Sequence, residues 1–334
     1  MVNSKEPSVS KEESRKFSFF MLGFIMIVIL YHSNFRYYYP FIEQLTAVST
    51  SYFFCISAFF FYKGLSNENF LTCLKKRYKT LLFPYLLWNL IYLILGFGTN
   101  QFSLSNVLKG FTVNPYCTPS WYMLTLFIFM LLTPVIKRAF CNVYSTIIAL
   151  SLGIAISYLG YIRFQIELAM VPIVGGYLIR MSEYITPYLI GGIIGTWFSQ
   201  KIYVGWKKSI VGVIMSSFII IILLLFNIPA EIRWLLWVIL PLALWESIPE
   251  KLFEHIRFLH IFTEPTFLIN MLHCYLLFVW QSVTAKNEFI TGKYLSALNV
   301  ILTLFASYFL YYLFKFFMPK ILQILTGNRI RKKI

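Results

Sequence analysis

Long apolar stretches alternate with short polar and basic segments along almost the whole chain. A helix that crosses a bilayer needs about 20 mostly apolar residues. Ten stretches meet this requirement: 17–33, 44–62, 80–97, 120–137, 143–161, 183–199, 209–227, 231–247, 261–284 and 294–317. The pattern predicts an all-α integral membrane bundle of about ten transmembrane helices. The stretches at 209–227 and 231–247 could instead form one long re-entrant element, because only a short turn separates them.

The composition excludes a soluble globular protein. Of the 334 residues, 59% are hydrophobic and 13% are charged, whereas soluble domains contain roughly 45–50% and about 25%. The remaining polar surface is too small to cover a water-exposed sphere of this size. We therefore expect a multi-pass protein of the cell membrane, either a plasma membrane or an inner membrane.

The positive charge fits a membrane better than a nucleic acid. The net charge is +16, from 29 Lys and Arg against 13 acidic residues. Most of the basic residues fall in the two termini and in every second loop between the predicted helices, starting with the loop after the second helix. Cytoplasmic loops carry such an excess of Lys and Arg. Both termini are therefore predicted to be cytoplasmic, and no nucleic-acid partner is expected. All acidic residues are Glu, which excludes any mechanism that needs an Asp.

One membrane domain accounts for most of the chain. We expect a cytoplasmic N-terminal tail at 1–16, a transmembrane domain at 17–317 and a basic cytoplasmic C-terminal tail at 318–334. The first apolar stretch has no small-residue cleavage site, which favours a retained helix over a signal peptide. The five Cys residues contain no close pair, so neither a disulfide framework nor a metal site is predicted.

Three ionisable side chains fall within or beside apolar stretches, where they are costly and therefore candidates for function. His32 ends the first stretch in the run ILYHS, where it could act as a general base or simply bind a headgroup or Asn34. His273 lies in the middle of TFLINMLHCYLL and could be catalytic or could bridge helices. Glu264 precedes the same stretch and could be a catalytic carboxyl group or an N-terminal cap.

A cluster of four cations forms a further candidate site in a predicted cytoplasmic loop. Its members are Lys75, Lys76, Arg77 and Lys79. Such a cluster could bind the phosphates of a nucleotide-like cofactor or serve only as a topology anchor. The chain has no GxxxxGK(S/T) phosphate loop, no HExxH and, without Asp, no His-x4-Asp motif, so ATP-driven transport and metalloprotease chemistry have no support.

Five segments in a fixed order carry a resemblance to a known family. They are ILYHS, YFFCISAFFFYKG, KKRYK followed by LLFPYLLW, SWYMLTLFIFMLLTP, and TFLINMLHCYLL. Over about 17–317 the chain resembles the acyltransferase-3 family, polytopic membrane O-acyltransferases that modify bacterial surface polysaccharides. The resemblance implies transfer of an acyl group, commonly acetyl, from cytoplasmic acyl-CoA to a hydroxyl of a surface glycan or a lipid-linked saccharide.

The resemblance also implies roles for individual residues. The positions that match family motifs are His32, Lys76, Arg77, Lys79, Trp121, Tyr122 and His273. The chain departs from the family at three positions where Arg is usual, which are Met21, Thr80 and Leu124. We expect the basic cluster to bind acyl-CoA, His32 to act as general base, and acceptor recognition to involve Asn34, Arg36, Trp121 and Tyr122.

The sequence is compatible with more than one mechanism and with more than one function. His32 and Arg77 are predicted on opposite sides of a core about 30 Å thick, so either the donor reaches far inward or an acyl-enzyme relay is needed, with His273 and Cys274 as a conceivable waypoint. Two other functions also fit the sequence. One is a polytopic transporter or flippase of a glycan or metabolite, and the other is a non-catalytic member of the same family.

Overall fold

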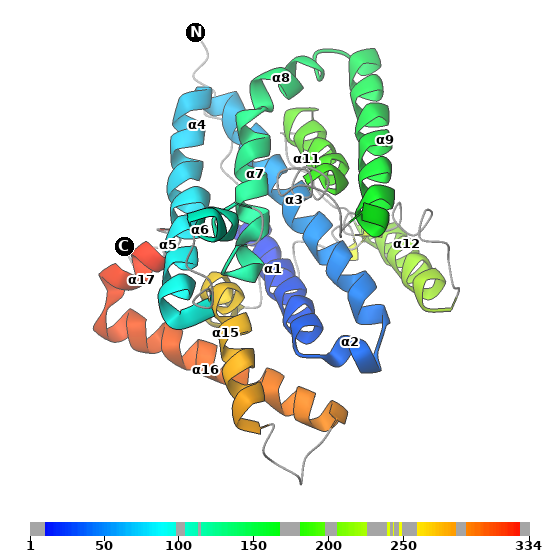
Figure 1. Cartoon of the computed structure of the whole chain (residues 1–334). Helices are drawn as coiled ribbons and strands as arrows, with labels where there is room; N and C mark the ends of the chain where they lie inside the picture. Colours follow the sequence, from blue (N-terminus) through cyan, green and yellow to red (C-terminus); the bar gives the residue numbers. More distant parts are fainter. Residues whose placement is uncertain are drawn as a thin grey trace.

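The computed structural model describes residues 11–97, 104–112, 115–167, 181–197, 206–225, 259–284 and 292–327, with a few isolated positions between 239 and 248. Every regular element in these residues is helical (Figure 1). The longer helices are α1 (Lys11–His32), α3 (Phe41–Asn67), α9 (Val143–Glu167), α12 (Trp206–Leu225), α15 (Thr266–Thr284) and α16 (Gly292–Phe317). The shorter α-helices are α2 (Phe35–Tyr38), α4 (Phe70–Arg77), α5 (Phe83–Tyr92), α6 (Leu104–Gly110), α7 (Trp121–Leu131), α8 (Thr133–Arg138), α11 (Ile185–Trp197), α14 (Leu259–Thr263) and α17 (Pro319–Leu325). Three tighter or wider turns complete the set: the π-helical segments η1 (Tyr78–Leu82) and η2 (Leu93–Phe97) and the 3₁₀ segment η3 (Thr118–Ser120).

Six helical segments among the described residues are long and apolar enough to cross a membrane. They are Arg15–His32, Phe41–Asn67, Phe70–Gly96, Val143–Gly160, Thr266–Thr284 and Gly292–Phe317. The helical membrane architecture is thereby confirmed for these segments. The count of ten spans and the cytoplasmic location of the termini stay predictions.

Three of the other predicted spans contain helices that are not among these six segments. The stretch at 120–137 is divided between α7 and α8 at Leu132, two residues before Pro134, whose ring cannot continue a helix. The stretches at 183–199 and 209–227 contain α11 and α12. The stretch at 231–247 lies almost entirely outside the described residues.

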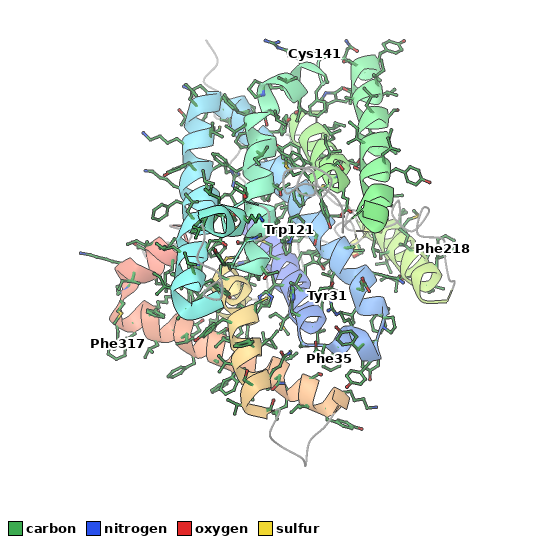
Figure 2. The ribbon with its side chains drawn as sticks, in the orientation of Figure 1. Tyr31, Phe35, Trp121, Cys141, Phe218 and Phe317 are labelled. Carbon is green, nitrogen blue, oxygen red and sulfur yellow. The ribbon has the colours of Figure 1, made fainter. Side chains whose placement is uncertain are left out.

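Large apolar side chains lie on the outer surface of the bundle. Phe218 on α12 and Phe317 at the end of α16 are 59% and 67% exposed (Figure 2). Such an apolar surface is unfavourable in water and favourable against lipid. The exposed side chains therefore agree with a membrane as the solvent.

The basic cluster lies on helix rather than in the predicted loop, so that part of the sequence prediction is wrong. The side chain of Asn69 accepts a hydrogen bond from the backbone N–H of Thr72 at 2.8 Å and caps α4 at its N-terminus. From there the chain stays helical through η1 and α5. The cap starts the helix before the cations, and the segment therefore includes all four of them.

Two glycines allow α11 to approach α3 closely. A Cβ atom at Gly191 would overlap the backbone of Cys55, and one at Gly195 would crowd the backbone of Phe59. The two glycines are one helical turn apart and form the small-xxx-small pattern that lets membrane helices pack backbone to backbone. This contact fixes α3, around which α1, α7 and α11 are arranged.

A second packing contact joins the beginning and the end of the chain. Ile25 and Ile29 of α1 pack with Ile269 and Leu277 of α15 and with Val300 of α16. These apolar residues recur at helical spacing, so each set forms one face of its helix. The contact brings the C-terminal end of α1 to the middle of α15.

Candidate active site

Two histidines meet where α1 packs against α15. His32 lies on the same face as Ile29, and His273 lies one turn after Ile269 on the face of α15 that meets α1. The centres of the two imidazole rings are 5.3 Å apart. His273 is completely buried, whereas His32 is half-buried. The apolar faces that pack the helices thus also place the histidines together.

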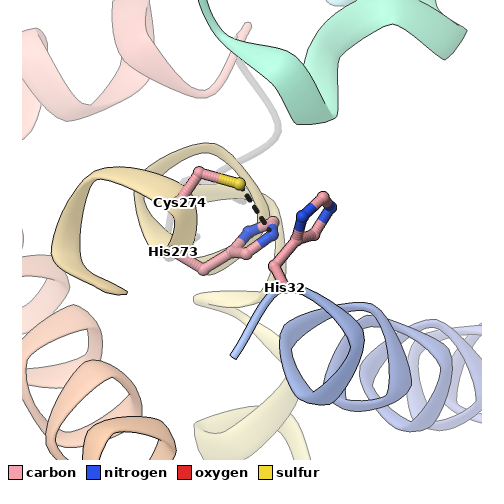
Figure 3. Close-up of side chains that lie close together, drawn as sticks. All are labelled: His32, His273 and Cys274. Carbon is pink, nitrogen blue, oxygen red and sulfur yellow. Dashed lines mark hydrogen bonds between the residues drawn. The ribbon is translucent and has the colours of Figure 1, made fainter. Parts of the chain in front are cut away.

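The protonation of His273 follows from its backbone contact. Its Nδ1 lies 2.8 Å from the carbonyl oxygen of Asn270. A carbonyl oxygen can only accept, so Nδ1 carries the proton and the Nε2 of the neutral ring is left as an acceptor. The Sγ of Cys274 lies 3.4 Å from that Nε2 (Figure 3). The thiol of Cys274 can therefore donate its proton toward His273.

The same three side chains are also possible metal ligands. One ligand atom from each of His32, His273 and Cys274 lies within 4.8 Å of the other two. Imidazole nitrogen and thiolate sulfur are ligands that zinc accepts. The expectation that the protein uses no metal accordingly stays a prediction.

The helix segment after the basic cluster holds the site from one side. The hydroxyl of Tyr92 donates to the carbonyl of Met271 at 2.6 Å and accepts from the backbone N–H of Tyr275 at 3.3 Å. The Asn89 side chain accepts from the N–H of Cys117 at 3.0 Å and thereby fixes the turn before η3. The segment η3 in turn packs against α15. Through Tyr92 and Asn89, α5 therefore positions both α15 and η3.

Asn89 and Tyr92 were missed at the sequence level. Both share a buried face of α5 with Tyr85 and Trp88. A hydrogen-bonding pair on an otherwise apolar helical face is the signal that could have identified them, because buried polar groups need partners.

Within the basic cluster, Arg77 differs from the three lysines. Lys75, Lys76 and Lys79 are exposed, and Lys76 forms an ion pair with Glu68. Arg77 is half-buried and interacts electrostatically with Tyr188. The guanidinium group therefore faces the interior of the bundle, while the lysines face outward.

The basic cluster and the histidines belong to different levels of the bundle. His32 precedes α3 and α4 follows it, and α3 is about 40 Å long for its 27 residues. Figure 1 accordingly shows α2 and the start of α4 at opposite ends of α3. The segment from α4 to α5 then runs back, so that Tyr92 lies about 22 Å along the helix from Arg77 and touches α15.

Glu264 is not brought to the histidines. It lies between α14 and α15, about 13 Å along the helix axis from His273. Its carboxylate accepts a hydrogen bond from the Lys315 ammonium at 2.7 Å. This ion pair links α16 to the start of α15.

Two of the expected acceptor-binding residues, Asn34 and Arg36, lie within four residues after His32. Asn34 is exposed and adopts a left-handed conformation with φ of 69°. The guanidinium of Arg36 donates to the hydroxyl of Tyr37 at 3.0 Å and lies 4.6 Å from the ring centre of Tyr31. The hydrogen bond to Tyr37 raises the pKa of Arg36. The turn after α1 therefore presents a fixed positive charge beside His32.

The other two expected acceptor-binding residues begin α7. The indole of Trp121 lies 5.4 Å from the ring of Tyr184, and Tyr122 stacks on Phe53 at 5.8 Å between ring centres. Both side chains are half-buried. They follow η3, which packs against α15, so they lie near the histidine level of the bundle.

These features define a class of protein: a polytopic helical membrane protein with a polar centre between its first helix and a late helix. A model of the acyltransferase-3 family, described as an acyltransferase domain, matches residues 21–316. The chain belongs to this family, and the match includes both histidines and the basic cluster. No curated protein and no solved structure matches the chain.

Proposed function

We propose that this protein is a membrane O-acyltransferase that moves an acyl group, commonly acetyl, from cytoplasmic acyl-CoA to a hydroxyl of a surface glycan or a lipid-linked saccharide. The observation that carries the proposal is the meeting of His32 and His273 inside the bundle of an acyltransferase-3 chain. A neutral imidazole can take the proton of a hydroxyl group as that group attacks a carbonyl carbon.

His32 is the base in this proposal. His273 is completely buried and holds its Nδ1 proton on the Asn270 carbonyl, whereas His32 is half-buried and can be reached by an acceptor. Arg36 and Asn34 follow in the next turn and can hydrogen-bond to the hydroxyl groups of a saccharide. Removal of the acceptor proton by His32 generates the oxygen nucleophile that forms the new ester.

The basic cluster binds the donor. Lys75 and Lys79 are exposed, and Arg77 faces inward. The lysines can therefore bind phosphates at the surface, while the guanidinium donates a charge-assisted hydrogen bond to a phosphate oxygen. The extended pantetheine arm then follows α5 toward Tyr92, which contacts the helix that carries His273. In this proposal the donor site lies on the cytoplasmic face of the membrane.

The test uses membrane vesicles with and without the protein, supplied with labelled acetyl-CoA and a native glycolipid extract. Wild type is expected to label the glycolipid, and His32→Gln is expected to lower the rate by about 10²–10⁴-fold, the usual contribution of a general base. Lys137→Ala serves as the control, because Lys137 is an exposed cation at the end of α8. Wild-type labelling equal to that of empty vesicles would contradict the proposal and favour a transporter or a non-catalytic role.

A further inference from the structure

We propose that Cys274 is the nucleophile that first receives the acyl group, as a thioester, before the group passes to the acceptor hydroxyl. The inference rests on the proposed function and adds a covalent intermediate to it. A two-step reaction does not require the donor and the acceptor to be bound at the same moment. The acyl group still has to reach the level of His32, because Cys274 lies beside it.

Cys274 has the arrangement of an activated nucleophile. Its Sγ lies 3.4 Å from Nε2 of His273 (Figure 3). Nδ1 of that ring is fixed by the Asn270 carbonyl at 2.8 Å. Nucleophile, base and orienting acceptor are the three parts that covalent acyl transfer uses. Adjacent residues on a helix point about 100° apart. The contact between Cys274 and His273 therefore depends on the conformations that these two side chains adopt.

Cys274 also differs from the other cysteines in its access. Cys55, Cys73 and Cys117 are buried, and Cys141 is exposed at the far end of the bundle beyond α8 (Figure 2). Cys274 is half-buried and neighbours His32. Among the five, it therefore combines a paired base with partial exposure.

The first half-reaction forms the thioester. The Cys274 thiol transfers its proton to Nε2 of His273 while Sγ attacks the carbonyl carbon of acyl-CoA. The bond between that carbon and the CoA sulfur then breaks, and the leaving thiolate takes the proton from His273. One thioester is exchanged for another, so no additional reactant is needed.

The second half-reaction uses the other histidine. His32 takes the proton of the acceptor hydroxyl, and the oxygen attacks the Cys274 thioester. The bond between the acyl carbon and Sγ breaks, and the departing sulfur receives the proton that His32 holds. The ligand atoms of the three side chains lie within 4.8 Å of one another, a distance that one small movement of a side chain can close.

The experiment is isotope exchange between labelled CoA and unlabelled acetyl-CoA on the purified full-length protein, with no acceptor present. Wild type is expected to exchange the label, because only a covalent acyl-enzyme returns its acyl group to free CoA. In a parallel incubation with acetyl-CoA labelled in the acetyl group, the label on the protein should be released by neutral hydroxylamine. Absence of exchange in wild-type protein that transfers acetyl to glycolipid would overturn the proposal.

Four variants make the result specific. Cys274→Ala should abolish exchange, and the nearly isosteric Cys274→Ser should hold the fold and retain acetyl as a hydroxylamine-resistant ester. His273→Gln should slow exchange by about 10²–10⁴-fold, as expected for loss of a general base. The matched control is Cys117→Ala, because Cys117 is buried and its Sγ contacts the carbonyl of Met271 on the same helix. Full exchange in Cys274→Ala would contradict the proposal.

His32→Gln separates this proposal from the proposed function. It should keep the exchange reaction and lose transfer to glycolipid. If wild type transfers acetyl to glycolipid and Cys274→Ala transfers it equally well, the covalent step is wrong and the acyltransferase function stands. If wild type exchanges CoA, Cys274→Ala does not, and wild type labels no glycolipid, Cys274 is supported and the glycan acceptor is wrong.

Discussion

The imidazole rings of His32 and His273 lie 5.3 Å apart although the two residues come from opposite ends of the chain. Their proximity depends on the packing of Ile25 and Ile29 against Ile269. The site is therefore assembled by helix packing and not by a loop. Its geometry should be sensitive to any change that shifts α1 against α15.

Arg77 should contribute more to donor binding than its neighbouring lysines. Arg77→Ala is expected to raise the KM for acetyl-CoA by about 10–100-fold, which corresponds to the loss of one hydrogen bond to a charged group. Lys75→Ala should change the KM by less than about fivefold, because an exposed cation is screened by solvent. Steady-state kinetics at fixed ionic strength measures both. Equal effects of the two substitutions would show that the inward orientation of Arg77 is irrelevant.

Glu264 should stabilise the fold through Lys315 and not take part in the chemistry. Glu264→Lys is expected to destabilise the protein by about 1–3 kcal/mol, because it replaces a charged hydrogen bond with two like charges. The double variant Glu264→Lys, Lys315→Glu should recover most of the melting temperature and the transfer rate. Recovery of the melting temperature without activity would instead indicate a direct role for the Glu264 carboxyl group.

The contact between α11 and α3 should tolerate no side chain at Gly191. Gly191→Leu is expected to destabilise the protein by about 3 kcal/mol or more, because the new atoms overlap the backbone of Cys55. The control is Gly23→Ala, since a Cβ at Gly23 has nothing within 4 Å. This substitution should change stability by no more than about 1 kcal/mol. Thermal unfolding in detergent with a size-exclusion assay compares the two, and a stable monodisperse Gly191→Leu would contradict the packing.

Zinc should inhibit the protein by binding to the histidine and cysteine cluster. The ligand atoms of His32, His273 and Cys274 are close enough to be drawn onto one ion, which would occupy the proposed base and nucleophile together. Transfer by wild type should fall with added Zn²⁺ and recover with a chelator. Competition with a chromophoric chelator should show binding weakened by about 10-fold or more in Cys274→Ser, because loss of a group that only orients a ligand already costs about that much and Cys274 would itself be a ligand. Unchanged zinc binding would place the ion elsewhere.

The membrane character and the family could be read from the sequence because both depend on local features. A run of apolar residues needs a lipid solvent wherever it packs, and each of the six long spans overlaps a predicted stretch. The order of short motifs identified the acyltransferase-3 family, which the match over 21–316 confirms. The helical state of the basic cluster was missed because it depends on the Asn69 cap, a single hydrogen bond that charge patterning does not reveal.

The assembly of the site could be decided only by the tertiary structure. The sequence identified His32 and His273 separately, but their meeting requires two distant apolar faces to pack in one register. The pairing of Glu264 with Lys315 and the anchoring of α15 by Tyr92 likewise join segments far apart in the chain. The sequence determined which solvent the helices need and which side chains are costly there. Only packing decided which of those side chains share a centre, because contact between helices depends on the complementary shapes of their faces.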